Sequence, residues 1–155
     1  MAVTEAQLTE AARGALLAAV EEAARGGQPY LGTAHLLLGL ARQGVTARAL
    51  AALGAPLPAL RREVARVGLG VAVPLVVDRG APVLTPGARA ALERAVAAAA
   101  RRGHPAAGPE DLLLALVGQG PSFAAHVLGR LGLAPDDVRA ALPSLSGRDA
   151  DLRTP

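Results

Sequence analysis

The segment Gly32–Leu40, which reads Gly-Thr-Ala-His-Leu-Leu-Leu-Gly-Leu, decides the fold because the chain contains a second version of it. The second version, Gly108–Leu116, reads Gly-Pro-Glu-Asp-Leu-Leu-Leu-Ala-Leu and lies 76 positions later. In both, a glycine and two or three small or polar residues lead into a Leu-Leu-Leu-x-Leu block, which is typical of a short helix buried on nearly every side. We call these segments the first motif and the second motif. They predict that the chain is a duplication.

Matches outside the two motifs support the duplication. At the same offset, Leu8-Thr9 matches Leu84-Thr85, Leu16 matches Leu92, Val20 matches Val96, Gly27 matches Gly103, and Gln43-Gly44 matches Gln119-Gly120. After a two-residue insertion the offset is 78, and Leu53-Gly54 matches Leu131-Gly132 while Arg61 matches Arg139. A repeat of this length is one supersecondary unit whose apolar face needs a neighbour. The two halves are therefore expected to pack against each other.

The composition favours an all-α fold. Of the 155 residues 52% are hydrophobic, yet the chain has one Phe, one Tyr and no Trp, so its core must be built from Leu, Val and Ala. That is the composition of closely packed helices rather than of a β-sandwich. All sixteen positive charges are arginines, which is typical of a GC-rich bacterial genome. The net charge of +3 is small, so it does not indicate a nucleic-acid partner.

Caps, breakers and helical spacing predict four helices in each half. The expected helices are Glu10–Arg25, Thr33–Ala41, Thr46–Leu53 and Pro56–Val67, then Pro86–Arg102, Pro109–Val117, Pro121–Leu131 and Pro135–Leu142. Thr9 and Thr33 are the expected caps of the first two helices. Proline suits the first helical position of all four later helices, because the N–H that it lacks would have no helical partner there.

Four segments follow from this division. Repeat one is assigned to residues 8–67, a linker rich in Gly, Pro and Val to 68–83, repeat two to 84–142, and a tail that is expected to be disordered to 143–155. The Val-Pro-Leu-Val-Val part of the linker, residues 73–77, is too apolar to hang free. It is expected either to lie across a groove between the halves or to pair as a short strand, and the sequence does not decide between these.

The residue types argue against an enzyme. Without cysteine there is no thiolate zinc site or cysteine nucleophile, and without lysine there is no standard P-loop. No Gly-x-Ser-x-Gly elbow occurs, and the three histidines, His35, His104 and His126, are not spaced as a local metal motif. His35 is predicted to have a structural or capping role. The chain is predicted to have no catalytic residue, no metal and no cofactor.

Paired acids and arginines are interpreted as surface features. The pairs Glu21-Glu22 and Asp136-Asp137 resemble ordinary solvated helix acids, and the second pair suits a helix N-terminus. Arg61 and Arg62 are expected to face water. The N-terminus carries acid where a signal peptide carries base, and no apolar run approaches the roughly 18 residues of a membrane span, so the chain is predicted to be cytoplasmic without membrane contact.

The two motifs, with the Leu-Thr and Gln-Gly pairs around them, resemble the double repeat at the N-terminus of the Clp/Hsp100 unfoldases of the ClpA and ClpC type. The resemblance covers residues 8–142. It implies two four-helix repeats packed as a pseudo-twofold eight-helix bundle. It also implies a module that docks a Clp ATPase, adaptor proteins, tagged substrate proteins or small ligands of the Clp protease system. Since no ATPase ring follows in this sequence, the chain is expected to be a free-standing Clp N-domain protein.

The resemblance also implies a site for phosphorylated arginine in each repeat. A Thr and backbone amides at the start of a first helix would bind the phosphate, which suits an anion, and a Glu of the motif would pair with the guanidinium. The corresponding residues are Thr9, Thr85 and Glu110. The first motif has Ala34 where the acid should stand, so one site lacks its charge partner. Alternatively, Thr9 and Thr85 are simple helix caps and Glu110 is ordinary first-turn charge.

One function of another class stays open from the sequence. A small helical regulator could bind nucleic acid through its arginines, with Arg61-Arg62 and Arg101-Arg102 as candidate phosphate contacts. The chain has almost no aromatic residues for base stacking and no evident recognition helix. Protein binding is therefore the favoured function.

Overall fold

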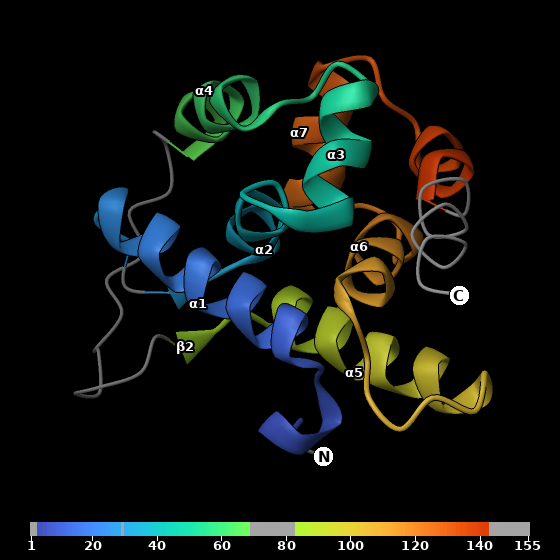
Figure 1. Cartoon of the computed structure of the whole chain (residues 1–155). Helices are drawn as coiled ribbons and strands as arrows, with labels where there is room; N and C mark the ends of the chain where they lie inside the picture. The colour runs from blue at the N-terminus through green and yellow to red at the C-terminus, as the bar shows by residue number, and fades with distance from the viewer. Residues whose placement is uncertain (1–2, 29, 69–82, 143–155) are drawn as a thin grey trace.

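The computed structural model describes residues 3–28, 30–68 and 83–142 and consists almost entirely of helices (Figure 1). A short 3-10 turn, η1 (Glu5–Gln7), comes first. The helices are α1 (Glu10–Arg25), α2 (Thr33–Leu40), α3 (Gly44–Ala52), α4 (Leu57–Gly68), α5 (Pro86–Arg101), α6 (Pro109–Gly118), α7 (Phe123–Arg130) and an eighth over residues 135–142. Two short strands, β1 (Tyr30–Leu31) and β2 (Val83–Leu84), pair in parallel. The prediction of two four-helix repeats is confirmed.

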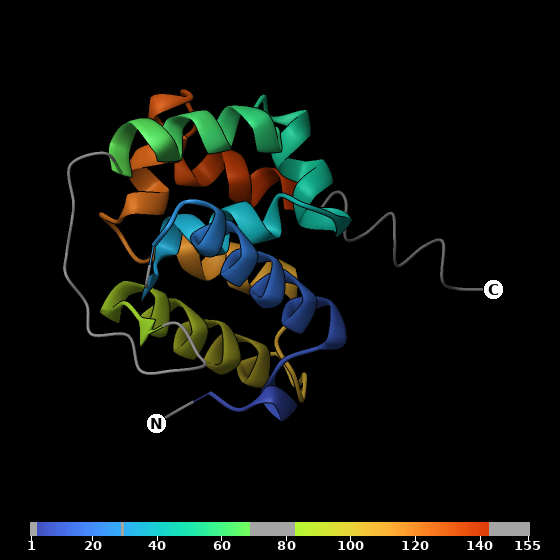
Figure 2. The same cartoon turned by 90° about the vertical axis from the view of Figure 1, so that its left-hand side faces the viewer.

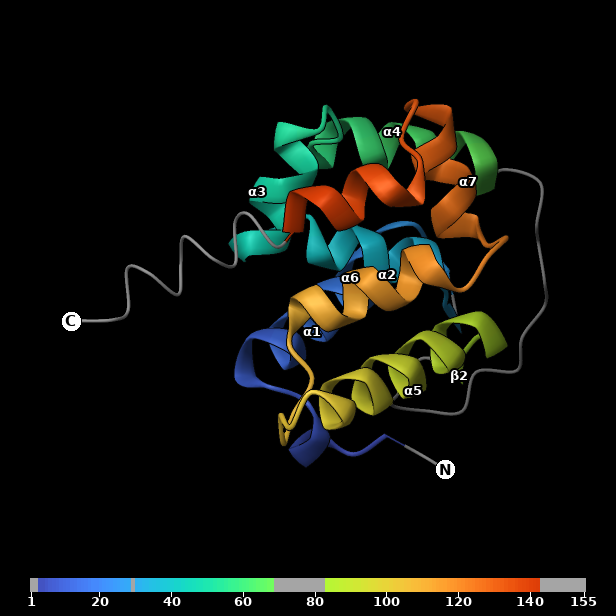
Figure 3. The ribbon, with the colours of Figure 1, turned by 90° about the vertical axis from the view of Figure 1, so that its right-hand side faces the viewer.

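The helices form three layers around the two motifs. α2 and α6, which carry the motifs, lie in the middle, with α1 and α5 on one side and α3, α4, α7 and the eighth helix on the other (Figures 2 and 3). Because α2 is covered on both sides, it has no solvent-facing stripe, whereas α6 is partly exposed at Glu110 and Leu114 and exposed at Gly118. Every residue of α2 is buried, as the all-round apolar Leu block predicts.

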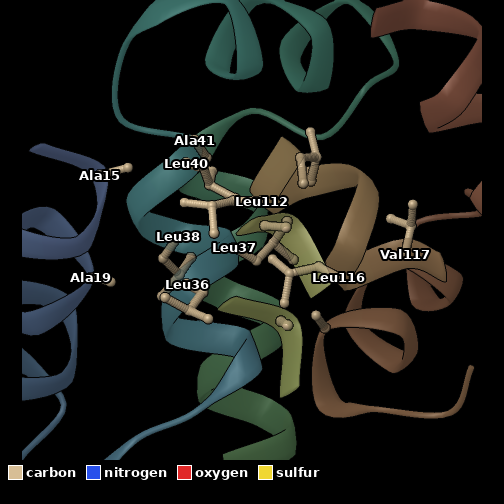
Figure 4. Close-up of a cluster of buried hydrophobic side chains, with 14 of the residues drawn as sticks. Ala15, Ala19, Leu36, Leu37, Leu38, Leu40, Ala41, Leu112, Leu116 and Val117 are labelled. Carbon is tan, nitrogen blue, oxygen red and sulfur yellow. The ribbon is translucent and has the colours of Figure 1, made fainter. Parts of the chain in front are cut away.

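Small residues let the layers approach closely. The inner face of α1 carries Ala12, Ala15, Ala19 and Ala23, all buried, and Ala15 and Ala19 face the Leu cluster of α2 (Figure 4). The backbones nearly touch at Gly39, where an added Cβ atom would lie 2.3 Å from the Ala15 carbonyl oxygen and 2.8 Å from the Ala19 nitrogen. Only glycine fits at this crossing.

The two repeats interlock. α7 of the second repeat packs on α2 and α4 of the first, and α3 of the first repeat packs on α6 of the second. A hydrogen bond fixes one of these crossings, since the buried Thr33 hydroxyl oxygen accepts from the Ala124 N–H at 3.2 Å. Each repeat thus covers the motif helix of the other, and both contribute to one core.

Several helix ends differ from the prediction. Thr33 does not cap its own helix: Gly32 holds the cap position, and the Thr33 hydroxyl serves α7 instead. Pro121 is not the first residue of α7, because Ser122 follows it as the cap and accepts from the Ala125 N–H at 3.1 Å. α3 begins at Gly44 rather than Thr46, and α4 at Leu57 rather than Pro56. Prolines 86 and 109 do open their helices, as expected.

The apolar part of the linker and the tail after residue 142 lie outside the described residues. Among the described helices, no single one is long and apolar enough to cross a membrane. α6 and α7 together have sufficient length and apolar composition, but they are bent by 87°, and they contribute Leu112, Leu113, Leu116 and Val127 to the core.

Candidate ligand-binding sites

The start of each repeat is held by the other repeat. Leu8, just before α1, forms a parallel bridge with Ala107, just before α6, and the Thr9 N–H donates to the Ala107 carbonyl at 2.9 Å. In the same way β1 pairs with β2, and the Thr85 N–H donates to the Leu31 carbonyl at 3.0 Å. Each candidate site is therefore shared between repeats. Sequence reasoning placed each site within one repeat, and the structure corrects this.

The crossed pairing brings Thr9 to Glu110. A Cβ atom built on Gly108 would lie 2.9 Å from Glu110 Oε2 and 3.9 Å from Thr9 Oγ1, so both side chains lie against the same glycine. Thr9 caps α1 by accepting from the Ala12 N–H at 3.1 Å. Within the described residues, no hydrogen bond or ion pair reaches the half-buried Glu110 carboxylate. We call Thr9, Gly108 and Glu110 the acidic site.

Two charged residues border the acidic site. Asp111 accepts from the Gly108 N–H at 2.9 Å through Oδ2 and forms an ion pair with Arg102 through Oδ1, so its charge is already compensated. Arg13, one turn into α1, donates to the Glu5 carbonyl at 3.1 Å and carries positive charge close to the start of the helix. Glu110 and the exposed Glu10, which follows Thr9, are thus the nearby acids without an ion pair among the described residues.

Thr85 lies in a different place. It caps α5 by accepting from the Ala88 N–H at 3.1 Å, and its methyl group would lie 3.6 Å from a Cβ atom on Gly32. Its neighbour from a motif is therefore Ala34 and not Glu110. A cavity of about 950 Å³ opens here between α1, α2, α4, α5 and α7, and both Thr85 and Ala34 line it. We call it the basic cavity, because three arginines and one glutamate line it.

The one acid of the basic cavity was misjudged from the sequence. Glu22 is buried, with 4% of its side chain exposed, and Arg61 grips both of its carboxylate oxygens, with Nε at 3.0 and 3.2 Å and Nη2 at 2.6 Å from Oε1. The hydrogen bond that Arg61 donates to the Glu22 carboxylate raises the pKa of Arg61 further above its usual range. Arg61 therefore does not simply face water. The spacing Ala15, Ala19, Glu22 follows the buried stripe of α1 and could have revealed Glu22.

His35 is the predicted capping residue. Its Nδ1 accepts from the Gly32 N–H at 3.0 Å, and its ring lies 5.7 Å from the Tyr30 ring. Burial lowers the pKa of His35, although nearby Glu22 partly opposes this effect. The ring is therefore neutral at pH 7, and with Nδ1 accepting, its proton resides on Nε2. The structure confirms the structural role and adds that His35 lines the basic cavity.

Neither site contains the groups of a nucleophilic or metal catalyst. The Ser122 hydroxyl is used as a helix cap, and no cluster of three His, Cys, Asp or Glu residues that could hold a metal ion occurs in the part of the chain that the structure describes. What the sites offer is charge, helix N-termini and apolar walls, which suit reversible binding.

A family model matches each half of the chain. The Clp repeat (R) N-terminal domain matches residues 7–80 and 83–153. The chain is 35% identical over 144 residues to the negative regulator of genetic competence ClpC/MecB of Bacillus subtilis (strain 168), covering 91% of this chain and 17% of that protein. It is 36% identical over 156 residues to the chloroplastic chaperone protein ClpC of Pisum sativum, covering 96% and 16%. The chain thus spans about a sixth of these relatives.

Solved structures agree on the fold. The N-terminal domain of the caseinolytic protease associated chaperone ClpD from Arabidopsis thaliana superposes with a TM-score of 0.72 at 21% identity, covering 89% of this chain and 93% of that one. The Hsp104 N-terminal domain from Candida albicans has a TM-score of 0.73 at 15% identity, covering 91% and 92%. The matches to both repeats confirm the resemblance seen in the sequence, and the chain belongs to the Clp repeat (R) N-terminal domain family.

Proposed function

We propose that this chain is a non-catalytic binding module of the Clp chaperone and protease system, acting in the cytoplasm, and that it docks adaptor proteins or tagged substrate proteins. Its family supports a place in this system, because the relatives that it matches are Clp chaperones. The match covers a repeat domain and no ATPase domain. Two preformed sites made of helix starts, rather than a set of reactive groups, support a binding role.

The acidic site is proposed to take a phosphorylated arginine side chain. The observation that carries this is the meeting of Thr9 and Glu110 at Gly108, with the Glu110 carboxylate unpaired among the described residues. The first N–H groups of α1 and the nearby Arg13 would receive the phosphate, since a helix N-terminus favours an anion. The carboxylate would pair with the guanidinium. Thr85 is left out of this site, because the crossed pairing puts Ala34 beside it.

Calorimetry with free phosphoarginine tests the assignment. We expect one site per chain, and we expect Glu110→Ala to abolish the binding, because the guanidinium loses the counter-charge proposed for it. A matched control is Glu21→Ala, which removes an exposed acid near the other end of α1 and should leave the affinity unchanged. Thermal unfolding of each variant checks that the fold is intact. An unchanged affinity in Glu110→Ala would refute the site.

The wider role is tested by immobilising the chain and passing over lysate of its own organism at two salt concentrations. Recovery of Clp ATPases, adaptors or arginine-phosphorylated proteins would support the proposal. Nucleic acid that washes off with salt, without any Clp component, would favour the alternative regulator. The structure gives that alternative little support, because Arg61 and Arg102 both form ion pairs with acids of other helices.

A further inference from the structure

Leu17, in the middle of α1, is a large apolar side chain on the surface of the bundle. Its exposed fraction is 67%, more than that of any other large apolar residue in the part of the chain that the structure describes. It belongs to the side of α1 that faces away from α2, because the opposite side carries the buried alanines. One exposed leucine is ordinary in a globular protein. Its neighbours on the helix decide whether it marks an interface.

The neighbours of Leu17 on this side of α1 form a stripe with the spacing of a helix–helix interface. Residues three and four positions apart lie on one side of a helix, and none of the five residues in this stripe is buried. They are Glu10, Gly14, Leu17, Glu21 and Ala24, and we call them the outer stripe. An added Cβ atom on Gly14 would meet nothing closer than Gln43 Nε2 at 3.8 Å. A second helix can therefore approach the backbone there.

The two ends of α1 carry opposite charges. Glu10 and Arg25 are exposed, and neither forms a hydrogen bond or an ion pair within the described residues. They are the first and the last of the 16 residues of α1, so each lies about 11 Å from the midpoint of the helix. Glu21, the other acid of the outer stripe, is already compensated by Arg42 at 2.6 Å. Both end charges suit the helix dipole, and together they make α1 complementary to an antiparallel copy of itself.

The surface next to Leu17 has room for a second apolar side chain. A cavity of about 1450 Å³ opens beside α1 on the side of α5, and Leu17 is one of the residues that line it. Its apolar lining also includes Leu16, Val20, Leu84 and Leu92, of which the first three are partly exposed. The Leu17 side chain of a second copy would therefore leave water for an apolar surface here.

We propose that the chain forms a twofold symmetric dimer in which α1 packs antiparallel against α1 of a second copy. Leu17 of each copy would lie against Gly14, at the edge of the cavity of the other, and Glu10 would pair with Arg25 at both ends of the helix pair. A twofold interface makes each contact twice, and the opposite charges set the orientation of the two helices. This proposal rests neither on the phosphoarginine site nor on Clp partners.

Sedimentation velocity of the whole chain in low-salt buffer, from micromolar to millimolar concentration, is the test. We expect the mass to double with a dissociation constant on the order of 10 µM, because one helix pair is a small interface, and we expect added salt to weaken the dimer. Leu17→Glu copies the acid at the matching position 93 of the second repeat and should weaken the dimer at least about tenfold. The control Phe123→Glu replaces an exposed apolar residue of α7, in the opposite layer (Figures 2 and 3), and should change little.

Two charge variants test the antiparallel orientation. Glu10→Arg and Arg25→Glu should each prevent the dimer, because like charges then meet at both ends of the helix pair. An equal mixture of the two variants should form a dimer again, since one helix then has positive ends and the other has negative ends. Thermal unfolding of every variant checks that the fold is intact. The proposal is overturned if the wild type stays monomeric at millimolar concentration, if Leu17→Glu and Phe123→Glu have equal effects, or if the mixture stays monomeric.

Discussion

The two motifs form equivalent helices in the middle layer of the bundle, and three of their differences are compared below. Both begin with a glycine whose N–H is accepted by the residue three positions later, His35 Nδ1 at 3.0 Å and Asp111 Oδ2 at 2.9 Å. The first motif buries all four of its leucines, and the second buries all but Leu114, which is partly exposed. They differ in the charge of the second helical residue, Ala34 against Glu110, in the chemistry of the capping residue, and in Gly39 against Ala115.

The comparison shows which positions of the motif must keep one kind of side chain for the fold and which can vary. The third helical position, His35 or Asp111, can hold either an imidazole or a carboxylate, because the glycine N–H requires only an acceptor there. The second helical position borders a candidate site in each repeat, with Ala34 lining the basic cavity and Glu110 lying against Gly108, so its charge can change without loss of the helix. The result is one acidic and one basic site built on the same backbone.

The largest effect on stability is expected when Gly39 is replaced by alanine, the residue at the matching position 115 of the second motif. Gly39→Ala would place a methyl group 2.3 Å from the Ala15 carbonyl oxygen, so α1 and α2 must move apart. We expect the free energy of unfolding to fall by about 3 kcal/mol, at the upper end for overpacked cores. Urea denaturation measures it. α5 and α6 already accommodate Ala115, which shows that the second helix pair leaves room that the first does not.

The matched control is Gly129→Ala in α7. A Cβ atom there meets nothing within 4 Å, so the substitution should be neutral or should stabilise by up to about 1 kcal/mol through helix propensity. Equal stability of Gly39→Ala and the wild type would show that the first helix pair is no tighter than the second.

A middle-sized effect is expected from the ion pair that only the first repeat has. Glu22 corresponds to Ala98 in the second repeat. Arg61→Gln leaves the buried carboxylate without its partner and should cost about 2 kcal/mol, less than for a fully buried pair because the Arg61 side chain is 34% exposed. Glu22→Ala should cost less, because the arginine can then extend into water.

Urea denaturation measures the difference in free energy of unfolding between Arg61→Gln and Glu22→Ala. The surface pair of Arg42 and Glu21 is the control, since 31% and 63% of its side chains are exposed, and Arg42→Gln should change the free energy of unfolding by less than about 1 kcal/mol. If Arg61→Gln costs no more than Arg42→Gln, burial of Glu22 has no energetic weight and the two repeats are equivalent here.

The repeat and its helices could be predicted from the sequence because they depend on local signals. The Leu blocks, the Thr9 cap and the prolines at 86 and 109 each act within a few residues, and the structure agrees with them. The crossed pairing could not be predicted, because it depends on which start segment lies beside which motif in space. That choice is made by contacts between residues such as Leu8 and Ala107, about 100 positions apart.

The candidate sites were predictable only in part for the same reason. Thr9, Thr85 and Glu110 lie at helix starts, where the sequence places them, and the structure adds that Thr9 rather than Thr85 meets Glu110. Glu22 and Arg61 are 39 positions apart, and nothing local marks them as partners. A single sequence gives little information about which charged residues pair when they lie far apart in the chain.

The smallest effect is expected from the capping chemistry, as a dependence of stability on pH. Burial lowers the pKa of His35 below its ordinary value of 6.5, with Glu22 of α1 opposing and Arg61 of α4 holding Glu22. As the pH falls below 6.5, the unfolded chain therefore binds a proton that the folded chain resists. The stability that His35 contributes is complete above pH 6.5 and declines as the pH falls toward the folded pKa, by at most about 1.4 kcal/mol per pH unit.

His35→Gln keeps an acceptor for the Gly32 N–H without a titrating ring, so it should remove this decline, whereas the exposed control His126→Gln should retain it. Urea denaturation between about pH 7 and 5.5 compares the variants. Parallel curves for the wild type and His35→Gln would mean that titration of His35 contributes nothing to the pH dependence of stability.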